Sequence, residues 1–401
     1  MTCRSFSLVY CCGEENHMAE YTKWVACWGN ATSIREQTEL RYTKDITLRY
    51  PVRMCFSGDR LRFHFSNLTG TEPVSFQASC AYCISDHLIN EESSKPITVN
   101  GSDLITIDPG QETVSDEMEY DVTAGTEICV SMYLGDFTQM NAGVLITGPM
   151  TRGYYSYGNQ MEEKELPLDL TRHTNWIYFL NTVDIRTEEK NHALVCFGDS
   201  ITAQDWPDDL MIRAWDNGFH DVSIIRRAVS GTRILREYSC ITYAAYGIKG
   251  ETRFPQEMNV AGCDTVLIQH GINDIIHPVG TDVNPWRPWS DLPTAEQMAE
   301  GYTKYYIEYA RKLGLKVYGG TLIPIKGWRT YEPFREDLKN EFNDWLRTTD
   351  LLDGCVDFDK AVRDPKDPAA FLKEYDSGDH LHPSKKGYQA MADAVPEELL
   401  R

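Results

Sequence analysis

Residues 193–200 have the sequence Ala-Leu-Val-Cys-Phe-Gly-Asp-Ser, which indicates the fold class of the second half of the chain. Five apolar residues in a row are typical of a strand that is covered on both faces, as in a parallel sheet. The glycine after them marks a tight turn at the end of the strand. We therefore expect a buried strand here, with helices packed against both sides of its sheet.

The sequence after residue 200 repeats this pattern in alternation with helices. Four more buried-strand runs occupy residues 222–225, 265–269, 316–321 and 355–358. The segment 294–313 opens with Thr294 and Gln297 at the spacing of a capping box. Its apolar residues then recur in steps of three or four, as Met298, Tyr302, Tyr305, Tyr309 and Leu313. Residues 335–347 and 385–400 show two more amphipathic helical patterns.

Strands that alternate with helices predict one particular class of architecture. Their sheet is parallel and is covered on both faces by helices that make right-handed crossovers. Five such strands favour a flavodoxin-like three-layer α/β/α sandwich. In this fold the catalytic groups gather at the carboxyl ends of the strands.

Before residue 190 the sequence has a different rhythm. Short runs such as residues 61–66, 104–107 and 127–134 alternate between apolar and polar residues, and turn sequences such as 108–110 (Asp-Pro-Gly) separate them. A period of two indicates strands with one buried and one solvated face, as in antiparallel sheets. No convincing helical pattern is visible between residues 40 and 150. We therefore predict an all-β sandwich of the jelly-roll kind.

These two rhythms predict two domains. We expect a β-sandwich accessory domain over residues 18–185 and an α/β catalytic domain over residues 186–401, preceded by a flexible extension over residues 1–17. The role of the accessory domain stays open. It could bind carbohydrate, cover one side of the active site, or mediate a homodimer.

The charge of the chain excludes some partners. Its 401 residues carry a formal net charge of −21, which repels phosphate backbones and favours neutral or cationic substrates over nucleic acid. No run reaches the ~18 apolar residues of a membrane-spanning helix, and we expect no membrane partner. Residues 1–17 lack the long apolar core and the cleavage site of a signal peptide. We therefore expect a cytoplasmic protein, with secretion as the open alternative.

Twelve cysteines are spread along the chain rather than concentrated in a small domain. Several lie in strand-like runs, where a reduced, buried thiol is the simplest interpretation. Cys80 and Cys83 form one C-x-x-C pair without a second pair to accompany it. Metal binding or redox chemistry is therefore the minor interpretation of this pair.

A serine stands directly after the first buried strand. In the segment 198–201 (Gly-Asp-Ser-Ile) the turn places Ser200 at the strand end, where its hydroxyl can act as a nucleophile in the crevice. The alternative is structural, because a serine after a tight turn often caps the following helix. This segment alone does not separate the two interpretations.

Two further strand ends carry groups that could stabilise an oxyanion. Gly231 has no Cβ to keep its backbone N–H away from a substrate, and Asn273 could donate from its side-chain amide. The alternatives are an ordinary turn at Gly231 and an Asx-turn at Asn273. Neither segment decides the question by itself.

The loop before the last helix contains an Asp–His pair. Asp379 precedes His382 by three residues, so its carboxylate can fold back onto the imidazole Nδ1–H and leave Nε2 free to accept the proton of a serine. A metal site formed by His380 and His382 is the alternative. It lacks obvious further ligands.

Together these blocks resemble those of the SGNH hydrolases, also called GDSL esterases and lipases. Ser200, Gly231, Asn273 and His382 match the four residues that name the family, and the segment 375–383 is especially similar to its last block. The resemblance extends from about residue 190 to the C-terminus. The first half is similar to the β-rich N-terminal region of a bacterial subgroup. Two residues depart from the family pattern: Ile201 replaces the usual leucine, and Thr232 stands where many relatives have asparagine.

The resemblance implies a serine esterase. Ser200 would attack an ester carbonyl, His382 would accept its proton, and Asp379 would orient the imidazole. The amides of Ser200 and Gly231 and the side chain of Asn273 would form the oxyanion hole. Such a mechanism requires no metal or organic cofactor. An acyltransferase that uses the same serine, and a non-catalytic carbohydrate-binding protein on a hydrolase scaffold, are the alternatives.

The candidate substrate contacts are Asp199 and four aromatic residues. The aromatic residues, which lie on two long loops after the third and fourth strands, are Trp286, Trp289, Trp328 and Tyr331. They could stack on a sugar or form an acyl pocket, and the alternative is that they pack the two loops together. Many relatives deacetylate carbohydrates, and the acidic sequence gives no sign of a lipid-surface binder. We expect a short-chain ester, above all an acetyl ester, of a small molecule or a carbohydrate.

Overall fold

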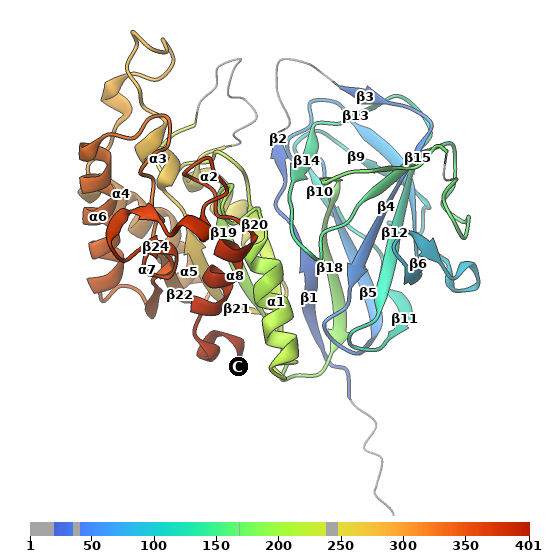
Figure 1. Ribbon diagram of the computed structural model, residues 1–401. Helices are drawn as coiled ribbons and strands as arrows, with labels where there is room; N and C mark the ends of the chain where they lie inside the picture. The colour runs from blue at the N-terminus through green and yellow to red at the C-terminus, as the bar shows by residue number, and fades with distance from the viewer. Residues whose placement is uncertain (1–19, 35–40, 168, 238–247) are drawn as a thin grey trace, which may run out of the picture.

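The structure is a computed structural model that describes residues 20–34, 41–167, 169–237 and 248–401 (Figure 1). A β-rich half, coloured blue to green, lies beside an α/β half, coloured yellow-green to red. The flexible extension predicted for residues 1–17 lies outside the described residues. None of the helices in the described ranges is long and apolar enough to cross a membrane.

The β-rich half contains two large antiparallel sheets. One has the strand order β1-β18-β5-β10, with β11 also paired to β5, and the other has the order β16-β15-β4-β12-β6-β7, with β8 and β9 also paired to β6. The smaller sheets are β13-β3 and β17-β14-β2. The bounds are β1 Lys23–Gly29, β2 Ser33–Ile34, β3 Tyr42–Thr43, β4 Ile46–Arg53, β5 Gly58–Ser66, β6 Val74–Ser85, β7 Leu88–Ile89, β8 Lys95–Ile97, β9 Leu104–Ile107, β10 Glu112–Val114, β11 Met118–Val122, β12 Glu127–Leu134, β13 Thr138–Gln139, β14 Ala142–Leu145, β15 Tyr154–Tyr157, β16 Arg172–His173, β17 Trp176–Tyr178 and β18 Leu180–Thr187.

The two large sheets pack face to face, as the sequence predicts for a sandwich. Residues on the inner faces alternate with solvated ones, most clearly in β9 and β11. Phe65 of β5 and Phe76 of β6 join the sheets across the core, with ring centroids 5.3 Å apart. The only helical segment between residues 41 and 150 of the described chain is a short 3-10 turn, Glu91–Ser93.

The α/β half is built on a five-stranded sheet with the order β20-β19-β21-β22-β23, in which every pair is parallel. The bounds are β19 His192–Gly198, β20 Val222–Ala228, β21 Cys263–Gln269, β22 Lys316–Gly320 and β23 Gly354–Val356. All five predicted strands are present, and the last one, predicted over residues 355–358, ends at Val356, because Phe358 begins α7. The first strand pairs on both sides, and all seven of its residues are buried, which accounts for its unbroken apolar run.

Helices cover both faces of this sheet. The bounds are α1 Trp206–Asp216, α2 Gly250–Glu257, α3 Ile272–Ile276, α4 Ala295–Tyr302, α5 Glu308–Lys312, α6 Pro333–Thr348, α7 Phe358–Val362 and α8 Lys385–Ala394. α1 packs on α8 and β20, whereas α4 packs on α6, and α5 and α6 pack on β22. Together with the strand order, these contacts define a flavodoxin-like three-layer sandwich. A short hairpin, β24 Arg363–Asp364 and β25 Asp367–Phe371, follows α7.

Two of the predicted helices differ in detail from the expectation. The segment 294–313 starts with the expected capping box at Thr294 and Gln297, but a π-helical stretch, Thr303–Ile307, separates α4 from α5. The last predicted helix, 385–400, ends at Ala394 and resumes as a 3-10 turn, Glu397–Leu400. Pro396 explains this break, because proline disfavours the helical conformation in the residue before it.

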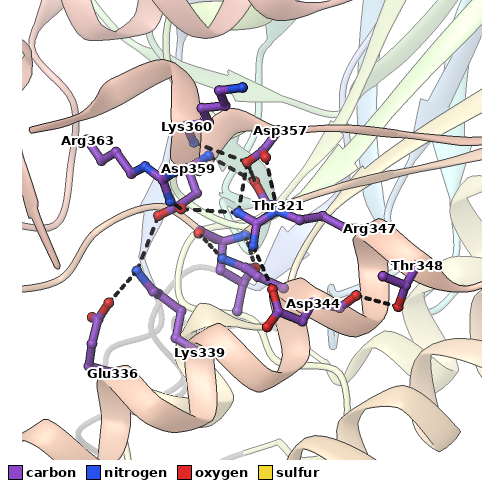
Figure 2. A network of polar contacts seen from close by, with 12 residues as sticks. Thr321, Glu336, Lys339, Asp344, Arg347, Thr348, Asp357, Asp359, Lys360 and Arg363 are labelled. Atoms are coloured by element: carbon purple, nitrogen blue, oxygen red, sulfur yellow. Dashed lines mark hydrogen bonds and ion pairs between the residues drawn. The ribbon is translucent and has the colours of Figure 1, made fainter. Parts of the chain in front are cut away.

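A buried ion network fixes α6 to α7 (Figure 2). The Asp359 carboxylate at the start of α7 receives Lys339 Nζ at 3.3 Å, Arg347 Nη2 at 3.2 Å and Arg363 Nη1 at 2.9 Å. Lys339 is fully buried and also meets Glu336 Oε1 at 3.0 Å. The network holds the helices that flank the last two strands of the sheet.

The two halves share one continuous core rather than meeting at a loose boundary. β1 packs along β20, and the Ala26 carbonyl accepts a hydrogen bond of 2.6 Å from Ser223 Oγ. Arg227 of β20, which is 2% exposed, donates to the Asn30 carbonyl and to Thr182 Oγ1 in the β-rich half. Burial of a charged group this deep requires these acceptors, so the contact is part of the fold.

Candidate active site

Ser200 follows a turn that only glycine can make. β19 ends at Gly198, where a Cβ atom would lie 2.3 Å from Thr202 Oγ1 and 2.5 Å from the Gln269 carbonyl of β21. The missing side chain lets the chain leave the sheet beside its neighbouring strand. Ser200 therefore lies at the carboxyl edge of the sheet, directly after Asp199, and is half-buried.

Ser200, His382 and Asp379 lie in a line of hydrogen bonds. Ser200 Oγ is 2.9 Å from His382 Nε2, and His382 Nδ1 is 2.7 Å from Asp379 Oδ2. Asp379 Oδ1 also accepts from the backbone amides of Leu381 and His382 and from Ser377 Oγ, at 2.9, 2.8 and 3.1 Å. Partial burial raises the pKa of Asp379, but these donors outweigh it and hold the pKa at about 2. The carboxylate is therefore ionised, which fixes the imidazole tautomer with a proton on Nδ1 and a free Nε2.

A second Asp–His pair shapes the same loop. His380 Nδ1 is 2.5 Å from Asp376 Oδ2, and His380 adopts a left-handed backbone conformation with φ of 64°. The loop after β22 packs against this ring, since a Cβ on Gly327 would lie 2.7 Å from it. His380 thus has its own carboxylate partner, separate from the Asp379–His382 pair. No group of three or more potential metal ligands occurs among the described residues.

The three proposed oxyanion donors follow three neighbouring strands. Ser200 follows β19, Gly231 follows β20, and Asn273 lies in α3 just after β21, so all three reach the same edge. Within the described residues, the Ser200 and Gly231 amides donate no hydrogen bond to protein acceptors. Asn273 Nδ2 donates one proton to the Thr232 carbonyl at 3.1 Å, and an amide nitrogen carries a second.

Thr232, where many relatives have asparagine, organises a buried network behind Gly231. Its hydroxyl donates to the Val229 carbonyl at 2.8 Å and accepts from Arg253 Nη1 at 2.7 Å. His270 Nε2 lies 3.0 Å from the same oxygen, and His270 Nδ1 lies 2.8 Å from Tyr306 Oη. Burial and the Arg253 charge hold the pKa of His270 well below its usual value. The imidazole is therefore neutral, and the acceptors available assign its proton to Nε2.

The same turn is tied to the loop that carries Asn273. Arg233 Nη1 donates to the Gly231 carbonyl at 2.9 Å and to His277 Nδ1 at 2.8 Å. Asp274 accepts from the backbone amides of residues 234 and 235 at 2.8 and 3.0 Å. These bonds keep the glycine amide and the asparagine amide in a fixed relation, which preorganised oxyanion stabilisation requires.

Asp199 has a different place from the other candidate substrate contacts. It is fully buried, and its Oδ1 accepts the Ile201 amide at 3.0 Å, while Oδ2 has no partner among the described residues. Burial raises the pKa of Asp199 to about 7. The side chain thus supports the turn that carries Ser200 and has no surface to offer a substrate.

The four aromatic candidates separate into two pairs. Trp328 stands edge-on to His382, with ring centroids 6.5 Å apart, and Tyr331 donates its amide to the Trp328 carbonyl at 2.8 Å. Trp286 is 59% exposed and Trp289 is 50% exposed. Trp289 packs on the start of α6, next to Phe334, with ring centroids 6.0 Å apart. The structure thus brings Trp328 beside the Ser–His–Asp line and places Trp286 and Trp289 at the surface of their loop.

The C-x-x-C pair lies in the β-rich half, on β6. Cys80 is buried, and burial raises its thiol pKa far above the usual value. Cys83 Sγ lies 3.4 Å from the Asp86 carbonyl. Every cysteine of the described residues carries a free thiol.

Sequence reasoning missed three residues of the site. Arg253 and His270 contact the Thr232 hydroxyl, and Tyr306 holds His270 at its Nδ1, yet the three residues come from a short helix, a strand end and a π-helical stretch far apart in the sequence. Only His270, which immediately precedes the Gly271 block, had a signal that could have been noticed.

A parallel sheet with a Ser–His–Asp line at its carboxyl edge defines a serine hydrolase by class. Comparison with protein families specifies the class further: the family described as GDSL-like Lipase/Acylhydrolase matches residues 194–395. The chain belongs to this family of carboxylic ester hydrolases.

Two solved structures illustrate the similarity. A GDSL-like lipase from Bacteroides thetaiotaomicron is 17% identical, covers 52% of this chain and 87% of its own, and has a TM-score of 0.34. An acetylxylan esterase from Geobacillus stearothermophilus is 14% identical, covers 53% of this chain and 96% of its own, and has a TM-score of 0.38. A search of curated proteins found no match.

Proposed function

We propose that the protein hydrolyses short-chain carboxylic esters, above all acetyl esters of carbohydrates, through an acyl-enzyme on Ser200. The proposal rests on one observation, the line from Ser200 Oγ through His382 to Asp379 with links of 2.9 and 2.7 Å. These distances lie within the range over which a general base can take a proton from a nucleophile.

Acylation follows from this geometry. His382 Nε2 takes the Ser200 proton while Oγ attacks the ester carbonyl, and the ionised Asp379 stabilises the imidazolium that forms. The charge on the carbonyl oxygen is met by the amides of Ser200 and Gly231 and by the free Asn273 N–H. Collapse of the tetrahedral intermediate breaks the bond to the alcohol oxygen, which leaves with the proton from His382. A single donor of this kind contributes about 3–4 kcal/mol to the barrier.

Deacylation repeats the same steps with water. His382 takes a proton from water, which attacks the acyl carbon, and Ser200 leaves with that proton as the free hydroxyl. The carboxylic acid is released. All groups needed for both steps belong to this chain, so the reaction requires no cofactor beyond them.

The acyl and alcohol parts are inferred from the surroundings of the serine. Trp328 beside His382 offers an aromatic ring to a sugar face or a small acyl group. The net charge of −21 favours neutral substrates over polyanions. A panel of p-nitrophenyl esters of increasing length tests the acyl part, and preference for long chains over acetate would contradict the proposal.

Replacement of the nucleophile tests the reaction itself. Ser200→Ala is expected to lower hydrolysis of p-nitrophenyl acetate by roughly 10⁴–10⁶-fold and to leave the circular-dichroism spectrum unchanged. Ser290→Ala, which removes a hydroxyl on the surface of the loop after β21, serves as the matched control and is expected to keep full activity. Retained activity in Ser200→Ala would refute the assignment.

The two alternative functions predict different products. An acyltransferase would transfer the acyl group to an added alcohol in preference to water, which product analysis detects. A non-catalytic binding protein would not react with a fluorophosphonate probe, whereas the hydrolase is labelled at Ser200 and the Ser200→Ala variant is not.

A further inference from the structure

A cleft of about 620 Å³ lies between the two halves of the molecule, next to the Ser–His–Asp line. The β-rich half contributes Thr147, Thr151 and Asn175 to its wall, and the α/β half contributes Gln204, Asp209 and Gln389. Its volume falls within the range of ~300–1,000 Å³ that is typical of small-molecule sites. The wall thus comes from both halves of the chain.

The cleft adjoins the catalytic groups through direct contacts. Gln204 Nε2 donates to the Ser200 carbonyl at 3.2 Å, and Ser377 Oγ, also on the wall, donates to Asp379 Oδ1 at 3.1 Å. Pro383, which follows His382, lies on the wall as well. A molecule in the cleft therefore touches residues that neighbour the serine, the aspartate and the histidine.

The β-rich side of the cleft is held in place by hydrogen bonds to the α/β half. The Thr147 amide donates to the Ala203 carbonyl at 3.1 Å, and its hydroxyl donates to Asp205 Oδ1 at 2.9 Å. Arg226 donates to the Thr147 carbonyl at 3.0 Å and pairs with Asp208 Oδ1 at 2.5 Å. The wall is thus preformed, which lowers the entropic cost of binding a ligand.

The polar groups of the cleft suit a polyhydroxylated, uncharged ligand. Hydroxyls and side-chain amides can both donate to and accept from sugar hydroxyls, and the carboxylates of Asp205 and Asp209 can accept from them. The Tyr388 hydroxyl, on a side chain that is only 2% exposed, lies on the wall without a partner in the described chain. A buried hydroxyl of this kind is normally hydrogen-bonded, so it points to a missing ligand or water.

The charge of the cleft argues against an anionic ligand. Burial raises the pKa of Asp209 to about 6, and the neighbouring carboxylates of Asp205, Asp208 and Asp393 add to the effect. At neutral pH Asp209 leaves negative charge on this wall, and Lys385 is the one basic side chain among the lining residues. Sugars that carry carboxylates would be repelled.

We propose that this cleft binds the sugar part of the ester, as a neutral oligosaccharide, and that the β-rich half is a structural part of the substrate site. The inference rests on the proposed function and extends it: it places the alcohol between the two halves and gives Thr151, Asn175, Asp209 and Gln389 the role of sugar contacts.

The test compares a large substrate with a small one. Asn175→Ala, Asp209→Asn and Gln389→Ala are assayed on p-nitrophenyl acetate, which is too small to fill the cleft, and on a panel of acetylated xylo-, manno- and gluco-oligosaccharides. Loss of one hydrogen bond predicts an increase in KM of about 5- to 10-fold on the best oligosaccharide and a change of less than about twofold on p-nitrophenyl acetate. Asp216→Asn, an exposed residue at the other end of α1, is the matched control and is expected to change neither.

The outcomes separate the inference from the proposed function. Failure of the wild type on p-nitrophenyl acetate, or full activity of Ser200→Ala, would overturn the proposed function. If the wild type hydrolyses p-nitrophenyl acetate but none of the acetylated oligosaccharides, the sugar cleft is overturned. Equal KM on the oligosaccharide in cleft variants and wild type, or equal losses on both substrates, would overturn it too. Calorimetry on Ser200→Ala with the best oligosaccharide provides a second readout, in which Asp209→Asn is expected to weaken binding 5- to 10-fold.

Discussion

Asp199, which precedes Ser200, and Asp379, which pairs with His382, have pKa values that are shifted in opposite directions. Asp379 accepts four hydrogen bonds, which hold its pKa at about 2, so it is an anion at neutral pH. Asp199 is fully buried and accepts only the Ile201 amide among the described side-chain bonds, and burial raises its pKa to about 7. Residues of one type thus play two roles: one orients the imidazole as a charge, and the other supports the serine turn.

The raised pKa of Asp199 makes a prediction about stability. Its folded-state pKa exceeds the unfolded value of ~3.9, so its contribution to stability is fully present below pH 4 and is lost as the pH rises towards 7. Asp199→Asn keeps the oxygen that caps Ile201 and removes the titration. From pH 4.5 to pH 8, the free energy of unfolding of the variant should therefore rise relative to wild type by a few kcal/mol, since one pKa unit corresponds to about 1.4 kcal/mol.

Urea denaturation at the two pH values measures this difference. Asp59→Asn is a suitable control, because the hydrogen bond from Arg186 holds the pKa of Asp59 below its usual value and its titration lies under pH 4.5. The difference in the free energy of unfolding between Asp59→Asn and wild type should be the same at both pH values. A pH-independent difference for Asp199→Asn would show that the carboxyl is ionised throughout.

At the level of elements, the packing of α6 depends on one carboxylate. Asp359 is 2% exposed and has Lys339, Arg347 and Arg363 around it (Figure 2). Asp359→Asn removes the carboxylate that these three cations share, and breaking a buried ion pair in this way costs about 3–5 kcal/mol. Lys339→Met should cost less, because two arginines still neutralise Asp359.

Unfolding in urea at pH 7 tests this ranking. Asp344→Asn removes a carboxylate that pairs with the same Arg347 but is 73% exposed, and a pair of that kind contributes at most about 1 kcal/mol. If Asp359→Asn is no more destabilising than Asp344→Asn, the network does not hold α6 in place.

The sequence predicts the helices and strands themselves better than the side-chain contacts between them. The five buried strands were found from short apolar runs, of which residues 193–197 form the longest unbroken one, and Thr294 with Gln297 marked a helix start through local chemistry. The network around Thr232 could not be found, since Arg253 reaches its hydroxyl from a helix 21 residues away, and Tyr306, 74 residues away, is joined to it only through His270. The local sequence pattern predicts where the helices and strands lie. The side chains that hold the turn at Gly231 and Thr232 depend instead on how those helices and strands pack together.

At the scale of the whole molecule, the sequence predicts two domains and the structure joins them. Polar residues such as Ser223 and Arg227 interrupt an apolar strand, and nothing in the local pattern explains them. Their partners, the Ala26 carbonyl and Thr182 Oγ1, belong to the other half. The cleft beside the triad depends on this interface between the two halves. Each half forms one wall of the cleft, so the walls keep their spacing only while both halves are folded.

A shared core predicts that the two halves unfold together. Arg49 lies on β4 of the β-rich half, fully buried, and donates hydrogen bonds to Ser131 and to the carbonyls of residues 87, 160, 161 and 163. Arg49→Lys cannot satisfy all of these acceptors and should lower the stability of that half by roughly 2–4 kcal/mol. If the molecule is one cooperative unit, thermal unfolding stays a single transition, and hydrolysis of p-nitrophenyl acetate is lost at the same lowered temperature.

The control is Arg60→Lys, which alters only partly exposed ion pairs with Glu117 and Glu119 in the same half and should leave both temperatures unchanged. The opposite result is equally definite. If Arg49→Lys produces an early partial transition in circular dichroism while activity persists to the wild-type temperature, the α/β half folds and functions independently of the β-rich half. The interface through Arg227 would then be a contact between two independent units, and the cleft could open without loss of the catalytic residues.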